Sequence, residues 1–234
     1  MFKYRSYQSE FLDADYIPQV DLYQNLKELD FINTWLGGHN ITIQGLAYFV
    51  NSKIRYLLED YITIADVGCG GGDNLLAIAK WARNQRIRVK LIGIDIKPDC
   101  INYAKENCKA FHEISFIESD YQLVDEKFDI IFSALFCHHL NDEQLVHYFK
   151  WCDSNSRMGF FVNDLQRNSL AFYSIKYLTK LLSKSYLVKN DAPLSVLRGF
   201  RKAELDVYLS KAKVDTFKIM WKWAFRYLVV RRKY

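Results

Sequence analysis

Residues 64–73 read Ile64-Ala65-Asp66-Val67-Gly68-Cys69-Gly70-Gly71-Gly72-Asp73, and this stretch decides the fold of the 234-residue chain. It is typical of an apolar strand that ends in an acid, followed by a glycine-rich turn and the start of a helix. Glycine has no Cβ and accepts positive φ angles, so such a turn lets the backbone pass close to a ligand. Asp73 is a good capping residue, which predicts that it caps the helix that follows.

The composition is that of an ordinary globular protein. Half of the residues are hydrophobic, a quarter are charged, and the formal net charge is +5. Lysine and arginine are spread along the chain except for the terminal Arg231-Arg232-Lys233. We therefore expect no nucleic-acid partner. No uncharged apolar run approaches the roughly 18 residues of a membrane span, so none is expected.

The cysteines and the first residues indicate a reducing compartment. The five cysteines are odd in number and form no Cys-x-x-Cys pair, which argues against a disulfide framework and a zinc site. The first residues lack the apolar segment of a signal peptide. We expect a cytoplasmic protein that binds no metal.

A strand–helix alternation begins at residue 62. The pattern predicts strands over residues 62–67, 89–96, 114–118, 128–135 and 157–162, and helices over 74–84, 99–107 and 142–153. Strands and helices at this spacing imply right-handed crossovers, a parallel sheet and helices on both faces.

Three additions surround this core of residues 62–165, and we expect them all in one domain. Residues 1–61 form a helical N-terminal cap, with apolar residues at helical spacing before Gly37-Gly38 and again over residues 43–58. Residues 166–200 form a helical insert, helical over 168–187, with a turn at Asp191-Ala192-Pro193. Residues 201–234 form a last helix, over 202–212, and an antiparallel hairpin over 216–230 that turns at 224–226.

The glycine turn is unsuited to a phosphate ligand. A dinucleotide fingerprint needs a third glycine three residues after Gly70, and Asp73 stands there. A P-loop is excluded as well, because no Gly-Lys-Ser/Thr follows the turn. The turn therefore favours a nucleoside ligand without phosphates.

Polar residues at two further strand ends support such a ligand. Ligands of doubly wound folds bind outside the carboxyl ends of the strands. Asp95 ends the second strand, where a carboxylate can accept hydrogen bonds from two ribose hydroxyls. Asp120 follows the third strand and is placed to accept from an adenine amino group, with Tyr121 available for stacking.

These motifs resemble those of class I S-adenosylmethionine-dependent methyltransferases. The matching segments are residues 66–72, Asp95, Glu118-Ser119-Asp120 and Phe128-Asp129-Ile130-Ile131-Phe132-Ser133. The resemblance implies a Rossmann-like, seven-stranded, mostly parallel sheet with a reversed last strand, and S-adenosylmethionine as the cofactor. It implies cofactor contacts at Asp66, Gly68, Cys69, Gly70, Gly72, Asn74, Asp95, Ile96, Asp120, Tyr121, Ala134 and Leu135.

The chemistry of transfer points to a histidine. An oxygen acceptor must lose a proton, and a histidine titrates near working pH. His138 is the first candidate for the base and His139 the second. Because adjacent histidines in an irregular turn should not point the same way, we expect one in the pocket and one in a structural role. The segment His138-His139-Leu140 also resembles quinone-biosynthesis methyltransferases, a group in which carbon methylation occurs too.

The acceptor site is expected in the added segments. Asn163 at the end of the fifth strand, with Tyr173, Tyr177 and Arg198 of the insert, are the candidate substrate contacts. Aromatic residues in the insert match a planar or phenolic small molecule. Arg198 either pairs with an anionic group of the substrate or lies in a solvated turn.

The leading prediction is O-methylation of a phenolic or polyketide-like metabolite. The alternatives are C-methylation of a quinone or lipid-like precursor, RNA or protein methylation, and a non-catalytic S-adenosylmethionine-binding module. No Pro follows Asn163-Asp164, so the Asn-Pro-Pro-Tyr pattern of amino-methylating nucleic-acid enzymes is absent. The sequence leaves the acceptor and the oligomeric state open.

Overall fold

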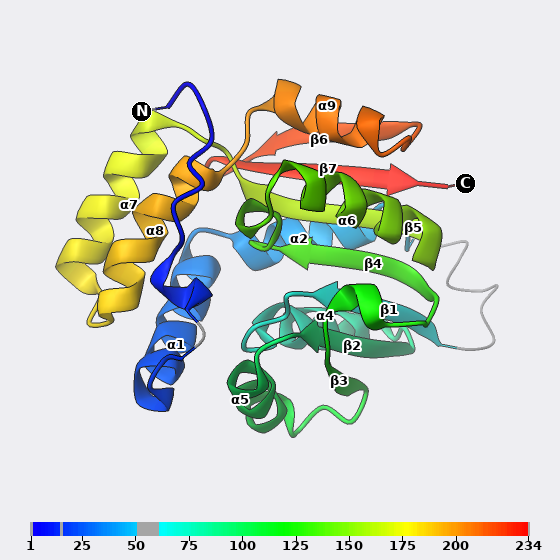
Figure 1. Cartoon of the computed structure of the whole chain (residues 1–234). Coiled ribbons are helices and arrows are strands. Elements are labelled where there is room, and N and C mark those ends of the chain that lie inside the picture. The colour runs from blue at the N-terminus through cyan, green and yellow to red at the C-terminus, as the bar shows by residue number, and fades with distance from the viewer. Residues whose placement is uncertain (1, 15, 51–60, 234) are drawn as a thin grey trace.

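A seven-stranded sheet lies at the centre of the computed structural model, which describes residues 2–14, 16–50 and 61–233 (Figure 1). Its strand order is β3-β2-β1-β4-β5-β7-β6. The five strands from β3 to β5 are parallel, and β7 pairs antiparallel with both β5 and β6. The predicted mostly parallel sheet with an antiparallel C-terminal hairpin is confirmed. The strands are β1 (Ile62–Val67), β2 (Val89–Asp95), β3 (Ile114–Glu118), β4 (Phe128–Ala134), β5 (Ser156–Leu165), β6 (Phe217–Lys222) and β7 (Arg226–Arg232).

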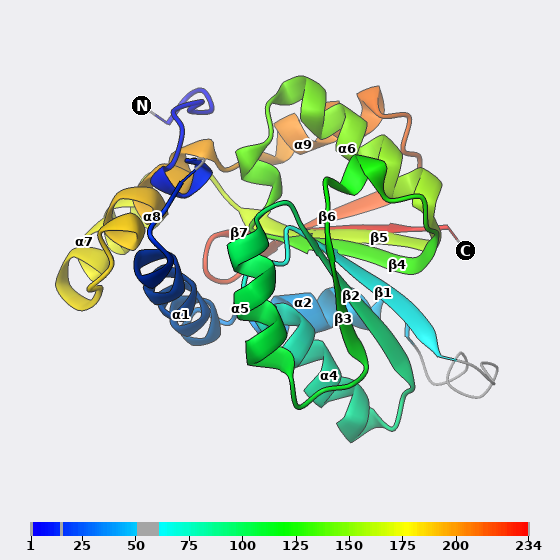
Figure 2. The same ribbon diagram turned by 60° about the horizontal axis from the view of Figure 1, so that its bottom comes forward.

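Helices cover both faces of the sheet, because its central strands are apolar on both sides (Figure 2). On one face, Ile64 packs in a core cluster with Leu75 and Ile78. On the other, Ile131 shares a core cluster with Leu145. The first face carries α2 (Gly38–Ala47), α4 (Asp73–Gln85) and α5 (Pro98–Cys108), and the second carries α6 (Asp142–Asn155) and α9 (Lys202–Lys211).

A third group of helices lies beyond the carboxyl ends of the parallel strands (Figure 1). It consists of the short η1 (Phe11–Asp13) and the helices α1 (Gln19–Trp35), α7 (Ser169–Leu182) and α8 (Tyr186–Arg198). Helix α8 contacts α7, α1 and η1, so the N-terminal segment and the insert form one layer over this edge. Within the described ranges, no helix has both the length and the apolar character needed to cross a membrane.

The insert differs from its prediction. The structure has two helices where one helix over 168–187 and a turn at 191–193 were expected. The helix is interrupted from Ser183 to Ser185, where Glu28 of α1 accepts the backbone N–H of Ser185 at 3.1 Å. The predicted turn lies inside α8, which contains Pro193. Asp191 is buried there and accepts the backbone N–H groups of η1, which explains a turn-forming residue within a helix.

Two predicted helix boundaries also differ. Gly72, with φ of 75°, holds the N-cap position of α4, so Asp73 is the first helical residue and not its cap. Its carboxylate instead accepts from Asn33 Nδ2 at 3.3 Å. The helix predicted over residues 43–58 begins at Gly38 and ends at Ala47. Residues 51–58 of that prediction lie outside the described residues.

The strand register brings the polar residues at the strand ends together along the edge formed by the carboxyl ends of the parallel strands. Asp95 pairs with Glu118, Ala134 with Asn163, and Leu165 with Arg226. Because β7 runs antiparallel to β5, its first residue meets the last residue of β5. This edge faces the layer formed by α1, α7 and α8 (Figure 1).

Candidate active site

The glycine turn between β1 and α4 is shaped by backbone conformations that side chains rarely adopt. Gly68, Gly70 and Gly72 have φ angles of 72°, 51° and 75°. At Gly68 a Cβ atom would also lie 2.3 Å from the Phe136 ring, so this position excludes any side chain. The turn thus brings bare backbone to the edge of the sheet.

Three polar or thiol side chains around the turn are buried. The pKa of Asp66 lies well above its ordinary value, first because of burial and then because of Asp73 and Asp95. Cys69 is buried against Gly93, where a Cβ would lie 2.8 Å from its Sγ. Asn74 Oδ1 accepts from Thr42 Oγ1 at 2.9 Å, which ties α4 to α2.

Asp95 and the turn are joined directly. Oδ2 of Asp95 accepts the Gly70 N–H at 2.9 Å, and Oδ1 accepts the Lys97 N–H at 2.9 Å. Burial raises the pKa of Asp95, and the two backbone hydrogen bonds oppose that rise. Ile96, the next residue, is 66% exposed. The carboxylate is therefore fixed at the edge beside the glycine turn.

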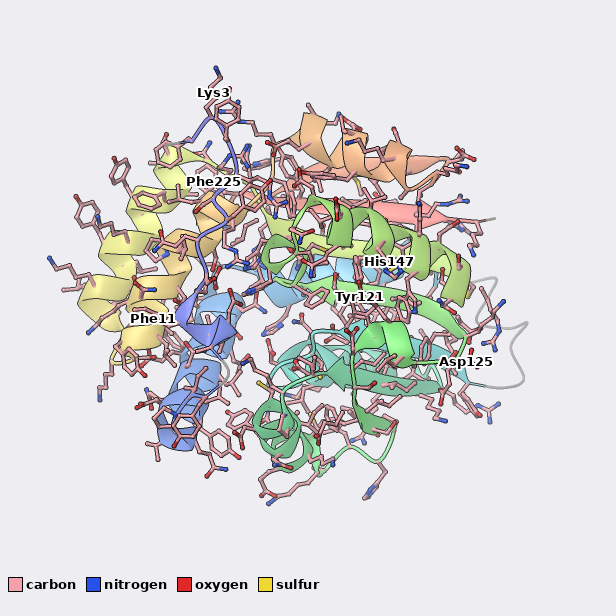
Figure 3. All side chains as sticks on the ribbon, in the orientation of Figure 1. Lys3, Phe11, Tyr121, Asp125, His147 and Phe225 are labelled. Atoms are coloured by element: carbon pink, nitrogen blue, oxygen red, sulfur yellow. The ribbon has the colours of Figure 1, made fainter. Side chains whose placement is uncertain are left out.

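The third strand end is less open than expected. Asp120 Oδ1 accepts the Gln122 N–H at 2.9 Å and caps the short helix η2 (Tyr121–Leu123). The Tyr121 ring is 6% exposed, and its edge-to-face contacts with Tyr148 and Trp151 place it in the core beneath α6 (Figure 3). Only this small exposed part of the Tyr121 side chain is left for the predicted stacking contact with an adenine.

The end of β4 leads to a cavity at this edge of the sheet. Ala134 ends the strand, and Leu135 follows with φ of 56°. The Leu135 N–H donates to the Asn163 carbonyl at 2.9 Å, which holds the bend against β5. Leu135 lines a cavity of about 320 Å³.

This cavity is apolar along most of its wall. Helices α1, α7 and α8 supply Leu29, Ile32, Ile175, Leu178, Val188 and Val196. The β6–β7 turn adds Trp223 and Phe225 to the wall, and Figure 3 shows where Phe225 lies. Polar groups gather where Glu10, His138 and His139 face the same space. Such a site suits a mostly apolar ligand with one polar group.

His138 is held by Asp164 at the end of β5. The His138 ring is 3% exposed, and its Nδ1 lies 2.7 Å from Asp164 Oδ1. A carboxylate only accepts hydrogen bonds, so Nδ1 carries the proton and Nε2 is left to the cavity. Although burial opposes it, His138 lowers the pKa of Asp164, which therefore stays ionised.

His139 lies beside His138 and not away from it. The ring centroids are 4.3 Å apart, and His139 Nδ1 lies 2.8 Å from Asp13 Oδ1. Both rings line the cavity, so the expectation of one pocket histidine and one structural histidine is wrong. The cause is the N-terminal segment, which brings carboxylates to this side of the short helix η3 (Cys137–His139).

Glu10 completes this polar end and was not predicted from the sequence. Its Oε1 lies 3.8 Å from His138 Nε2, and its Oε2 lies 3.9 Å from His139 Nε2. Burial raises the pKa of Glu10 to about 7, although His139 and Arg198 oppose the rise. One nitrogen or oxygen atom from each of the three side chains lies within 4.8 Å of those of the other two, a spacing that a metal ion would also accept. No local pattern marks Glu10, because it meets the histidines only through tertiary contact.

The predicted substrate contacts fall in three different places. Arg198 is 6% exposed, so it does not lie in a solvated turn, and it donates to the carbonyls of His138 and His139 at 3.1 and 2.9 Å. Asn163 is fully buried and donates to the Gly38 carbonyl at 3.1 Å. Tyr173 and Tyr177 are 47% and 64% exposed on α7, which turns aliphatic residues to the cavity instead.

The comparisons with known proteins agree with this geometry. Residues 58–163 match a family model described as a methyltransferase domain. The mitochondrial ubiquinone biosynthesis O-methyltransferase of Saccharomyces cerevisiae is 27% identical over 124 residues, which are 50% of this chain and 38% of that protein. A putative protein N5-glutamine methyltransferase of Methanocaldococcus jannaschii is 32% identical over 134 residues, which are 51% of this chain and 66% of that protein.

Among solved structures, human N-acetylserotonin methyltransferase in complex with S-adenosylmethionine has a TM-score of 0.64 at 15% identity. The match covers 92% of this chain and 56% of the human one, and at this identity it shows the shared fold. The chain spans less than two thirds of the length of each of these three proteins.

Proposed function

The chain carries a class I S-adenosylmethionine-dependent methyltransferase domain, and we propose that it methylates a hydroxyl group of a small, largely apolar molecule bound in the cavity. One observation carries this proposal. A buried histidine, His138, has its Nδ1 fixed by Asp164 at 2.7 Å and turns its Nε2 into an apolar cavity at the end of β4.

The residues at the turn fit the cofactor. Each oxygen of Asp95 accepts one backbone N–H, which leaves a lone pair on each for the two ribose hydroxyls. Oδ1 of the buried Asp66 has no hydrogen-bond partner in the described part of the chain. A buried polar atom of this kind needs a partner, and a ligand on the bare turn at residues 68–72 would supply it.

The chain's own residues position the acceptor and remove its proton. When bound, S-adenosylmethionine supplies a methyl group on a positively charged sulfur. The aliphatic walls from α1, α7 and α8 hold the acceptor and exclude water. The hydroxyl group of the acceptor is thereby kept close to His138. His138 Nε2 takes the hydroxyl proton, and Asp164 stabilises the imidazolium that forms, in the manner of an oriented general base.

The polar end favours an oxygen acceptor over a carbon one. A hydroxyl has a proton that lies within reach of a fixed base, and the cavity brings Glu10, His138 and His139 to one place. Carbon methylation of a quinone precursor remains the alternative that the same apolar cavity accommodates. Protein or RNA acceptors are less favoured, because the cavity lies beneath α1, α7 and α8 and its walls are aliphatic.

The test is transfer of an isotope-labelled methyl group to a panel of phenols, quinone precursors, bulk RNA and bulk protein. We expect label on the oxygen of a phenolic compound, and equal transfer with and without a metal chelator, because the base needs its Nε2 free. Label on carbon selects the alternative. Label only in RNA or protein contradicts the proposal.

A further inference from the structure

Arg226 is a buried cation that lines the cavity, and two of its nitrogen atoms have no hydrogen-bond acceptor in the described part of the chain. It is the first residue of β7, is 3% exposed and lines the cavity. Its Nη2 donates to Asn33 Oδ1 at 3.0 Å, but Nε and Nη1 have no hydrogen-bond partner in the described part of the chain. A buried, incompletely paired charge is costly, so the position calls for a ligand.

The two acids whose charges act on Arg226, Asp164 and Asp73, already accept hydrogen bonds from other groups. Burial lowers the pKa of Arg226 to about 10, while Asp164 and Asp73 oppose the fall, so the side chain is a cation at neutral pH. Asp164 accepts from His138 and from the Leu165 N–H, and Asp73 accepts from Asn33. Neither acid forms an ion pair with the guanidinium among the described residues.

A second unsatisfied donor lines the same cavity. Asn25 of α1 is 1% exposed, and its Nδ2 has no hydrogen-bond partner in the described ranges. Asn25 and Arg226 come from segments about 200 residues apart in the chain, so the two open donors are independent observations. Both donate and neither accepts through these atoms, which selects an anionic or carbonyl partner.

We propose that Arg226 binds the carboxylate of a ligand in this cavity. A guanidinium presents a planar pair of N–H groups that matches the two oxygens of a carboxylate. Aliphatic side chains of α1, α7 and α8 line the same cavity as Arg226, so the apolar remainder of such a ligand can lie along them. This inference rests on the proposed function in one respect, because its two candidate ligands are the cofactor and the acceptor of the proposed methyl transfer.

Two ligands of the site can supply this carboxylate. One is the amino-acid end of the cofactor, since Arg226 is linked through Asn33 to Asp73, the residue that follows the glycine turn. The other is an acid group on the acceptor, since Arg226 lines the same cavity as His138. Binding measurements on matched ligand pairs separate these sources.

The experiment is calorimetry of the full chain with two ligand pairs. The first pair is S-adenosylhomocysteine and 5′-methylthioadenosine, which lacks the amino-acid end. The second is 4-hydroxybenzoate and its methyl ester. We expect the wild-type chain to prefer the acid in at least one pair, and Arg226→Gln to reduce that preference by about tenfold or more, the usual size of a charge-assisted hydrogen bond. The pair that responds identifies the source.

Arg231→Gln is the matched control, because it makes the same substitution on the same strand. Arg231 pairs with Asp153 at 3.2 Å and does not line the cavity, so the preference should survive there. Arg226→Lys keeps the charge without the planar pair of donors and should give an intermediate loss, which also serves if Arg226→Gln fails to fold. No preference for either acid in the wild type, or a preference unchanged in the Arg226 variants, overturns the proposal. Because binding needs no turnover, this failure would leave the proposed methyl transfer standing.

Discussion

The proposed cofactor end and the proposed acceptor end of the site are built from different kinds of contact. At the cofactor end, Asp66, Gly70 and Asp95 lie within about thirty residues of one another and meet through neighbouring strands. At the acceptor end, His139 meets Asp13 across 126 residues, and Arg198 meets the same Asp13 across 185. One end is local in sequence, and the other is assembled only when the whole chain has folded.

This difference separates binding from chemistry. The turn at residues 68–72 and Asp95 form a rigid part of the sheet edge, whereas Glu10, His138 and the cavity wall depend on the outer layer of helices. A substitution at one end should therefore change one function and spare the other. Four predictions test this separation, in order of expected size.

Removal of His138 should have the largest effect. His138→Ala is expected to lower turnover roughly 100- to 10,000-fold, the range for a lost general base, with S-adenosylhomocysteine affinity unchanged. Turnover is measured by labelled-methyl transfer and affinity by calorimetry. His147→Ala, on the exposed surface of α6, is the control and should keep both values. Full activity in His138→Ala would remove this residue from the mechanism.

Glu10 should make stability depend on pH. Its pKa is raised from 4.5 to about 7 in the folded state, so the folded chain prefers the protonated form. That stabilisation is fully present below about pH 4.5 and is lost as pH rises through about 7. Glu10→Gln keeps the shape without the ionisation, so at pH 8.5 its free energy of unfolding should exceed that of the wild type by up to about 3 kcal/mol.

Urea unfolding between pH 4.5 and pH 8.5 measures this effect. The two chains should differ least at the acidic end and most at the alkaline end. Glu143→Gln, at an exposed site on α6, should follow the wild type throughout. A constant difference across the pH range would show that the pKa of Glu10 is the same in the folded and the unfolded chain.

Loss of Asp95 should weaken the cofactor end alone. Asp95→Ala is expected to lower the affinity for S-adenosylhomocysteine by about tenfold or more, because hydrogen bonds to a charged group are lost. Asp125→Ala changes an exposed carboxylate in the loop before β4 (Figure 3) and should bind normally. Unchanged binding in Asp95→Ala would sink the ribose assignment.

The smallest effect is expected at the tyrosines of α7. Tyr177 is 64% exposed and does not line the cavity. Tyr177→Phe should therefore change turnover by no more than about twofold, since exposed substitutions away from special features usually cost little. Leu178→Phe, one residue later on the cavity wall, should change the acceptor preference in the same assay. A large loss in Tyr177→Phe would place that side chain in the acceptor site after all.

The strands of the proposed cofactor end are predicted well because their signals are local. The strand over residues 62–67 was predicted with the bounds that β1 has, and the predicted strand over 114–118 coincides with β3. Apolar runs between glycine and acid residues mark such strands without knowledge of their neighbours. The cap of α4 was misplaced by one residue, because Gly72 and Asp73 both suit an N-cap and only the backbone conformation distinguishes them.

The acceptor end could be predicted only in part. His138 stands out in the sequence, but Glu10 and Asp13 lie at the two ends of the short helix η1, in an N-terminal segment that carries no motif. The prediction of a turn from Asp191 to Pro193 was wrong. Asp191 accepts hydrogen bonds from η1, and local sequence propensity does not reveal such a tertiary contact. Arg226 was read as part of a hairpin turn, and its burial depends on α1 and on the register with β5.

The orientation of the His138 ring tests the central claim most directly. Nitrogen-15 NMR of the imidazoles, recorded at a pH where the ring is neutral, distinguishes a proton on Nδ1 from one on Nε2. The contact with Asp164 predicts that neutral His138 carries its proton on Nδ1, and that Asp164→Asn removes this preference. A proton on Nε2 in the wild-type chain would contradict a base that faces the cavity.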